Sequence, residues 1–279
     1  MTRNLIILFS AVLVIIGCSK DEDRPRATNL IIDFTHTVSS ENLLIGSSCT
    51  ESGQCYIDEN GNMPCCNGEG LPYFPYTNSS GEKYNISRLN YLISNIRLHT
   101  SDGQQIELKE VHFVDADDAA TLRLNTGELD NGTYSKISFT MGLDTSLNTP
   151  NRYVNPAGNP IQDIMWWPMP SDLYHYMKLE GEFDTIDNGY RTHTGPTMGM
   201  DMSFNNEFDL SINVNDNLGN ITISVNMELN NWYQSPNEIS FSSYGPPGQN
   251  GIMQNMMMQH KLEQNGESDV FTIITKIDR

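Results

Sequence analysis

Hydrophobic and polar residues alternate with a period of two along most of the chain, which is typical of β-strands rather than helices. In the segment 30–38, LIIDFTHTV, the alternate positions from Leu30 to Val38 are apolar except for His36. His36 is therefore expected to point to the buried side of its strand. Similar runs predict further strands at 91–100, 105–115, 134–144, 174–184, 207–215, 220–229 and 269–277.

Turn residues separate these runs, for example Asp-Gly at 102–103 and Asp-Asn-Gly at 130–132. Many short strands joined by turns predict an all-β fold, and we expect an antiparallel β-sandwich. The spacing becomes helical only near the C-terminus, where one short amphipathic, Met-rich helix is predicted at about 251–264. Its expected apolar stripe contains Ile252, Met253, Met256, Met257 and His260.

The first 17 residues read as an export signal, because Arg3 precedes an apolar run that stops at Cys18. That run is too short for a comfortable membrane span. Residues 15–18, Ile-Ile-Gly-Cys, resemble the lipobox of bacterial lipoprotein precursors, in which the cysteine is acylated and anchors the protein to a membrane. The acidic residues of 19–23 resemble the tether that directs lipoproteins of Bacteroidetes-type bacteria to the cell surface.

These features predict an outer-membrane lipoprotein whose domain faces the cell surface or the periplasm. We expect a signal peptide at 1–17, a lipid-anchored tether at 18–26 and one domain at 27–279.

Four further cysteines lie in a polar, glycine-rich stretch at about 45–72, which we expect to be a loop inserted after the first strand. An even set of cysteines in an exported protein favours two disulfides. Neighbouring Cys65 and Cys66 can hardly pair with each other, so each is expected to reach back to Cys49 or Cys55. The spacing matches no CxxC pair, although a thiolate metal cluster is the alternative interpretation.

The formal net charge is −19, with 16 basic and 35 acidic residues. Removal of residues 1–17 takes away Arg3, so the net charge of the remaining chain is −20. A surface of this sign repels nucleic acid, so no nucleic-acid partner is expected. The sequence contains no HExxH, GxSxG, phosphate-binding glycine loop or CxxC redox pair, and we do not expect an enzyme.

A series of segments resembles the copper-binding MbnP-like family of exported β proteins, and they occur in that family's order. They are DFTH at 33–36, the long segment 76–98, VHFVD at 111–115, GTYSKISFTMGLD at 132–144, MWW at 165–167, YHYMKLEG at 174–181 and RTHTG at 191–195. The resemblance implies an extracytoplasmic β-sandwich, in agreement with the period-two pattern.

The resemblance also implies Cu(I) bound by histidines, with a nearby tryptophan that in some members is oxidised to kynurenine in connection with a dihaem peroxidase-like partner. His36 and His193 lie in matched segments and are the expected imidazole ligands. Trp166 and Trp167 match the tryptophan-rich segment. The chain departs from the family's pattern at PMPSDL, before Tyr174, where a second spaced tryptophan and a glycine are expected.

Cu(I) is a soft ion that favours thioether and imidazole ligands. Strand-like alternation in TMGMDMSF would place Met198, Met200 and Met202 on one side, a few residues beyond His193. They are candidate soft ligands, or they fill a sheet core. The alternative to a copper protein is a metal-free surface lipoprotein that recognises a glycan, a peptide or a partner protein.

Overall fold

The computed structural model describes most of the chain that follows the predicted tether. The described residues are 28–45, 62–64, 70–72, 74–185, 188–215, 219–245 and 251–277. The predicted signal peptide, the tether, Cys18 and the cysteines at 49, 55, 65 and 66 lie outside these residues. The disulfide prediction therefore stays a prediction.

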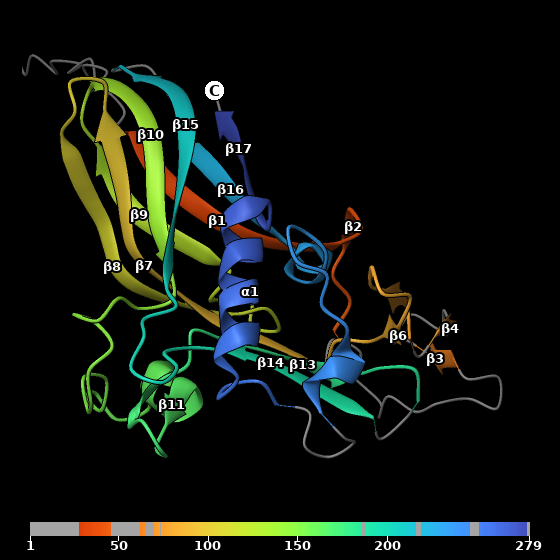
Figure 1. Ribbon diagram of the computed structural model, residues 1–279. Coiled ribbons are helices and arrows are strands. Elements are labelled where there is room, and N and C mark those ends of the chain that lie inside the picture. Colours follow the sequence, from red (N-terminus) through yellow and green to blue (C-terminus); the bar gives the residue numbers. More distant parts are fainter. Residues whose placement is uncertain are drawn as a thin grey trace, which may run out of the picture.

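Two β-sheets form the body of the described chain (Figure 1). The first sheet has the order β17-β16-β1-β2, and β9 also pairs with β1. Its strands are β17 (Phe271–Ile277), β16 (Ile221–Glu228), β1 (Thr28–Val38), β2 (Glu41–Asn42) and β9 (Arg123–Leu129). The predicted inward face of β1 is confirmed, because Leu30, Ile32, Phe34, His36 and Val38 are all buried.

The second sheet has the order β14-β13-β7-β10-β15, and β8 also pairs with β7. Its strands are β14 (Gly189–Thr194), β13 (Met177–Glu182), β7 (Arg88–Thr100), β10 (Gly132–Met141), β15 (Phe204–Val214) and β8 (Gln105–Asp115). One hydrophobic core draws side chains from both sheets, which makes the fold a β-sandwich. The predicted all-β class is confirmed.

One pair of strands differs from the expected antiparallel arrangement. β1 and β16 are parallel, with Leu30 opposite Ile221 and His36 opposite Met227. Parallel neighbours need a long crossover, and here almost the whole sandwich separates the two strands along the chain. The sheet is thus completed by contacts between strands from the two ends of the chain.

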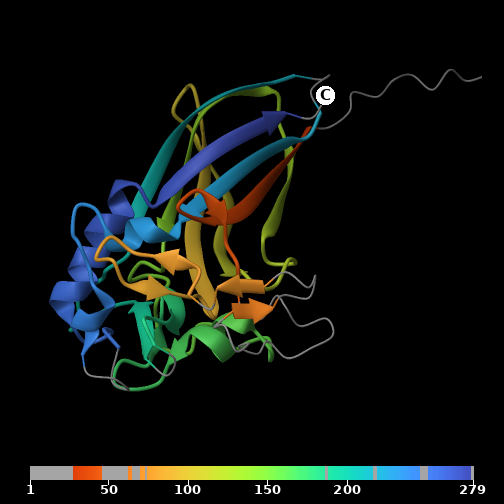
Figure 2. The same ribbon diagram turned by 90° about the vertical axis from the view of Figure 1, so that its right-hand side faces the viewer.

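Short elements build the end of the molecule that lies away from the C-terminal end of β17 (Figures 1 and 2). They are the strand pairs β3 (Asn62–Pro64) with β4 (Gly70–Pro72), β5 (Tyr76–Thr77) with β6 (Lys83–Tyr84) and β11 (Trp166–Trp167) with β12 (Leu173–Tyr174), and the short helices η2 (Ile161–Met165), η3 (Leu229–Tyr233) and η4 (Phe241–Tyr244). Within the described residues, no helix is both long and apolar enough to span a bilayer.

The predicted C-terminal helix is present as α1 (Met256–Ser268), but its buried face differs from the predicted one. Met256, Met257 and His260 face solvent, whereas the buried residues are Met258, Gln259, Leu262, Asn265 and Gly266. The expected stripe was wrong because Asn255 caps the helix and the chain before it is not helical. Gly266 brings the helix against Phe204 and Trp232, which decides the face that is buried.

Gly142, just after β10, has a φ of 93° and lies directly against Tyr176. A Cβ at this position would lie 2.5 Å from Tyr176 Cγ, far inside van der Waals contact. Gly142 therefore lets the Tyr176 ring approach the sheet at the end of the molecule described below.

We predict that Gly142→Ala lowers the free energy of unfolding by about 3 kcal/mol, because it combines a disfavoured backbone conformation with overpacking. Gly103→Ala is the matched control, since Gly103 has a similar φ of 89° and nothing within 4 Å of its would-be Cβ. We expect Gly103→Ala to lower the free energy of unfolding by only about 1 kcal/mol, because it introduces the backbone strain without the overpacking. Denaturant unfolding of both variants measures the difference, and equal losses would contradict the role of the Tyr176 contact.

Candidate metal site and adjoining cavity

Two histidine rings meet at the edge of the second sheet. The ring centroids of His175 and His193 are 5.0 Å apart, and the ring planes are inclined by 70°. His175 is 5 % exposed, and the side chain of His193 is 18 % exposed. Two imidazole rings from adjacent segments therefore lie together at a largely buried place.

Backbone pairing produces this juxtaposition. His193 lies on β14, opposite Lys178 of β13. The chain just before β13 is tied to both neighbours, since Tyr176 N donates to Thr194 O at 2.7 Å and His175 N donates to Met165 O at 2.8 Å. The position of His175 is consequently set by main-chain hydrogen bonds rather than by its own ring.

The His175 ring has no polar partner at one of its nitrogens. Nδ1 is buried and makes no hydrogen bond. Burial, with smaller contributions from the nearby charges of His193 and Lys178, lowers the pKa of His175 to about 2. The ring is therefore a neutral imidazole at ordinary pH, the form that binds metals. An unpartnered buried polar group of this kind lowers the stability of the folded protein by about 1–3 kcal/mol.

Glu180 orients the second imidazole. Its Oε1 lies 2.7 Å from His193 Nε2 and 3.4 Å from Arg88 Nη1. Burial alone would raise the pKa of Glu180, but the hydrogen bond with His193 and the charges of His193 and Arg88 outweigh it and lower this pKa to about 2. The carboxylate thus stays charged and holds Nε2, which leaves Nδ1 of His193 available. A carboxylate on the far nitrogen is the usual support of a metal-binding histidine.

Trp167 covers the His175 ring. The two rings stack at a centroid distance of 5.3 Å and an angle of 20°. Trp167 reaches this position because the β11–β12 hairpin pairs it with Leu173, two residues before His175. Its neighbour Trp166 is 39 % exposed and donates its indole hydrogen to Asp172, so only one of the two predicted tryptophans adjoins the histidines.

His36 and His193, the predicted ligand pair, do not meet. His36 Nε2 lies 3.0 Å from the Tyr91 hydroxyl in the sandwich interior. Tyr91 pairs with Met177, and Met177 pairs with Thr194, so these three share the inner face of the sheet. His193 is the next residue to Thr194 in its strand and points to the opposite face. His36 and His193 therefore cannot bind the same metal ion in this arrangement, because the second sheet lies between their rings.

The strand-like alternation expected for Met198, Met200 and Met202 is also wrong. Thr197 and Met200 exchange two backbone hydrogen bonds of 3.0 Å and close a tight turn. Met198 is 78 % and Met200 52 % exposed, whereas Met202 is 4 % exposed within a second hydrophobic cluster below the sandwich core. A turn centred on Gly199 breaks the alternation, which places Met202 away from the other two.

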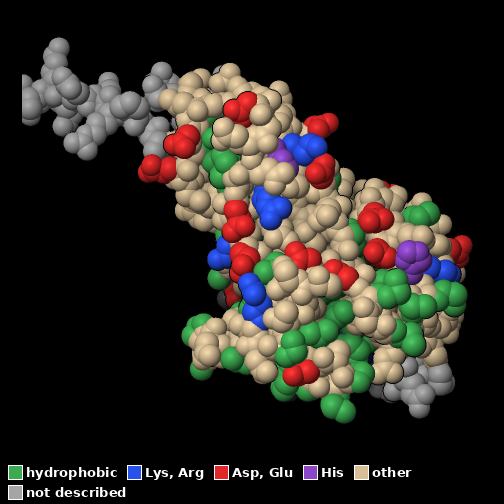
Figure 3. All heavy atoms as spheres, turned by 60° about the vertical axis from the view of Figure 1, so that its left-hand side comes forward, with side chains coloured by type: hydrophobic (Ala, Val, Ile, Leu, Met, Phe, Trp, Pro, Cys, Tyr) green, Lys and Arg blue, Asp and Glu red, His purple; other side chains and the backbone are tan. Residues whose placement is uncertain are grey.

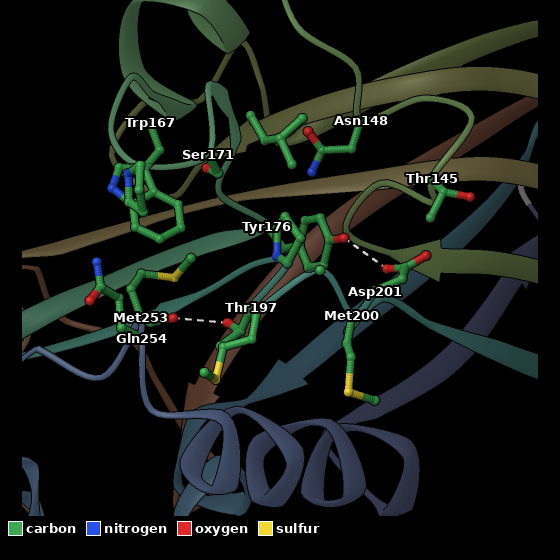
Figure 4. Close-up of a pocket in the computed structure, with 15 residues that line it drawn as sticks. Thr145, Asn148, Trp167, Ser171, Tyr176, Thr197, Met200, Asp201, Met253 and Gln254 are labelled. Carbon is green, nitrogen blue, oxygen red and sulfur yellow. Dashed lines mark hydrogen bonds between the residues drawn. The ribbon is translucent and has the colours of Figure 1, made fainter.

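A cavity of about 520 Å³ lies next to this site, because Trp167, which stacks on His175, is one of its lining residues (Figure 4). Trp167 and Tyr176 form part of its wall, and the Tyr176 hydroxyl donates to Asp201 Oδ1 at 2.7 Å. Its remaining wall includes Met198, Met200 and Met253. Another unpartnered buried atom, Ser171 Oγ, belongs to a lining residue.

The sequence did not predict that His175 lies beside His193, although that residue lies in the matched segment YHYMKLEG. The available signal was its spacing of eight residues from Trp167, which a short hairpin folds into contact. His99 and His112 have local structural partners, namely Ser138 Oγ and the Thr121 carbonyl. Among the residues that the structure describes, no group of three or more His, Cys, Asp or Glu side chains is arranged to hold a metal ion.

Comparisons with known proteins agree on the fold. The family model described as MbnP matches residues 27–257. The solved structure of MbnP from Methylosinus trichosporium superimposes with a TM-score of 0.52, covering 90 % of this chain and 99 % of that one at 11 % identity. At this identity the structural likeness shows the fold alone. No curated protein matches the sequence.

Burial of His36 makes the stability of the protein depend on pH. It lowers the pKa of His36 to about 4, from 6.5 for an exposed ring. As the pH falls from 6.5 to 4, the unfolded chain takes up a proton at this residue that the folded chain excludes. We predict that this single group removes roughly 3 kcal/mol of stability across that window.

Unfolding free energies of wild type and His36→Gln, measured from pH 7 to pH 4, test this. The variant is expected to lack that part of the pH dependence. Tyr91→Phe should retain it, because burial and not the hydrogen bond causes the shift. Parallel pH profiles for wild type and His36→Gln would show that the ring is protonated in the folded protein.

Proposed function

This chain belongs to the MbnP family, and from that premise we propose that it binds Cu(I) through His175 and His193. One observation carries the proposal. A neutral, buried imidazole with an unpartnered Nδ1 lies 5.0 Å, between ring centroids, from a second imidazole whose far nitrogen is held by a carboxylate.

The residues present fit a soft cation. Imidazole and thioether are ligands that copper accepts, and both kinds occur here. The side chain of Met253 lies near the backbone of His175, since a Cβ built on Gly195 would lie 3.6 Å from Met253 Sδ and 3.5 Å from His175 Cα. A ligand on His175 would also satisfy a nitrogen that is otherwise buried without a partner.

Trp167 is the residue of this site that oxidative modification would affect. Its indole lies flat on the His175 ring, so a change in the ring of Trp167 would alter the surroundings of His175 directly. We therefore assign to Trp167, rather than to Trp166, the role that the family resemblance gives to a modified tryptophan. A dihaem peroxidase-like protein is the proposed partner for that oxidation.

The proposed setting is the cell envelope. An acylated Cys18 would tether the domain to the outer membrane, and the acidic segment 19–23 would favour display at the cell surface. There the protein would serve copper uptake, storage or detoxification as a binding protein and not as an enzyme. Mass spectrometry of the mature protein would show the lipid on Cys18.

We predict that replacing both histidines, as His175→Phe with His193→Gln, lowers Cu(I) affinity by about 100-fold or more, because both imidazole ligands are lost. Phenylalanine preserves the stacking on Trp167, and glutamine preserves a donor to Glu180. Competition with a chromophoric Cu(I) chelator measures the affinity, and thermal unfolding checks that the variant folds.

His36→Gln is the matched control, because His36 is equally buried but lies on the other side of the sheet. Its Cu(I) affinity is expected to equal that of wild type. Wild-type Cu(I) affinity in the double variant would refute the assignment of His175 and His193 as ligands. A loss of affinity in His36→Gln would show that His36 contributes to copper binding.

A metal-free binding role is the second candidate. The cavity of about 520 Å³ is large enough for a small organic group, and its walls combine aromatic and methionine side chains with a few polar groups. A wild-type protein that retains no copper would favour this role, with a glycan, peptide or partner protein as the ligand class to examine.

A further inference from the structure

Methionine side chains are exposed around the cavity to an unusual degree. Met198 is 78 % exposed, Met200 is 52 % exposed, and both line the cavity. Large apolar side chains are mostly withdrawn from water in folded proteins, and single exceptions are common. Met198 and Met200 are exposed at the same opening, so their exposure differs from that of apolar residues scattered singly over a surface.

The backbone makes the position of Met198 more unusual. Met198 has a φ of 52° at the centre of the turn closed by Thr197 and Met200, and Gly199 follows with a φ of 81°. Such a turn favours Asn, Asp or Gly at its first central position. A methionine therefore occupies a place where it gains little burial and where its backbone conformation is disfavoured.

A hydrogen bond fastens this turn to the inner wall of the cavity. Thr197 Oγ1 donates to the Met253 carbonyl oxygen at 2.8 Å, and Figure 4 shows both residues on the wall below Trp167. Thr197 is 2 % exposed and Met253 is 9 % exposed, so this joint is buried. The turn that carries the exposed thioethers is thus joined directly to the backbone of Met253.

Met253 in turn lies close to the backbone of the segment that carries His193. Its methyl carbon lies 2.8 Å from the position that a Cβ on Gly195 would occupy, and Gly195 is two residues from His193. Gln259 Nε2 donates to the His193 carbonyl at 2.7 Å and lies 3.9 Å from Met253 Sδ. Met253 therefore lies between the turn that carries the exposed methionines and the backbone beside His193, and all three thioether residues line the same cavity.

The geometry points to a loading route: we propose that Met198 and Met200 capture Cu(I) at the surface and that Met253 passes it inward to His175 and His193. This inference rests on the proposed function, and it adds residues that set the rate of copper entry rather than the affinity. Thioethers are soft, uncharged ligands that keep no proton, so transfer between them releases none.

The surroundings of the route agree with a cation as its occupant. Figure 3 shows hydrophobic side chains gathered at the lower end of the face drawn, at the height where Figure 1 places β11. Asp201, between Met200 and Met202, also lines the cavity, and the chain as a whole carries a net charge of −19. A protein of net negative charge attracts cations, and here Asp201 places a carboxylate at the cavity.

The test is the rate at which the purified protein takes Cu(I) from a chromophoric chelator, followed by stopped flow. Met198→Leu with Met200→Leu keeps the size and apolarity of both side chains but removes sulfur. We expect loading to be slower by about tenfold or more while the equilibrium affinity is unchanged, since a lost contact of about 1.4 kcal/mol in the rate-limiting step gives that factor. Met257→Leu is the matched control, because Met257 is 67 % exposed on α1 and does not line the cavity.

The possible outcomes separate this inference from the proposed function. A double methionine variant that loads at the wild-type rate overturns the route and leaves copper binding intact, and an exposed surface that contacts a protein partner then becomes the better explanation. A wild-type protein that takes up no copper refutes both.

A second readout does not depend on the tight site. In the His175→Phe, His193→Gln variant with methyl-labelled methionines, Ag(I) should shift the NMR signals of Met198, Met200 and Met253 but not that of Met257. Unshifted signals of the first three residues would also overturn the route.

Discussion

A buried imidazole without a hydrogen-bond partner is the constraint around which the candidate site is arranged. The His175 ring is packed under Trp167 and beside His193, and its Nδ1 meets no polar atom. The fold tolerates the resulting cost of about 1–3 kcal/mol. It does so because main-chain bonds from His175 to Met165 and from Tyr176 to Thr194 fix the backbone, and Trp167 and His193 pack against the ring. A preorganised ring of this kind binds a cation without first losing conformational freedom.

The surrounding residues support that ring from both sides of the sheet. Glu180 and Arg88 hold His193 on the outer face, while the Tyr91 and Met177 row fills the inner face. Glycines permit close approach at two points: Gly142 admits the Tyr176 ring and Gly195 admits the Met253 methyl group. The site is therefore built from the edge of a rigid sheet, and the cavity beside it is walled by the turn, hairpin and loop that this sheet carries.

Local patterns were sufficient to predict most strands of the two main sheets, but not β9 or β14, the strand that carries His193. The period-two burial of β1 and the exact bounds of β8, 105–115, follow from alternation that each strand shows by itself. The parallel pairing of β1 with β16 could not be predicted in this way, since it depends on contacts between the two ends of the chain. The buried face of α1 depended on Gly266 packing against Phe204, which no helical spacing reveals.

The candidate site was predictable only in part, for the same reason. His193 and Trp167 were found because they lie in motifs of the family. His36 is buried as its strand pattern indicates, but whether it faces His193 depends on which side of the second sheet each ring occupies. Met198 and Met200 alternate in sequence as a strand would, and only the positive φ of Met198 and Gly199 shows that they form a turn.

The most direct test of the account is the response of each histidine ring to a soft cation. NMR spectra of the protein with ¹⁵N-labelled histidines, recorded during titration with Cu(I) or Ag(I), report on the imidazole nitrogens individually. We expect large shifts at Nδ1 of His193 and at Nδ1 of His175, with His36 unchanged. Shifts at His36 with none at His175 would contradict it.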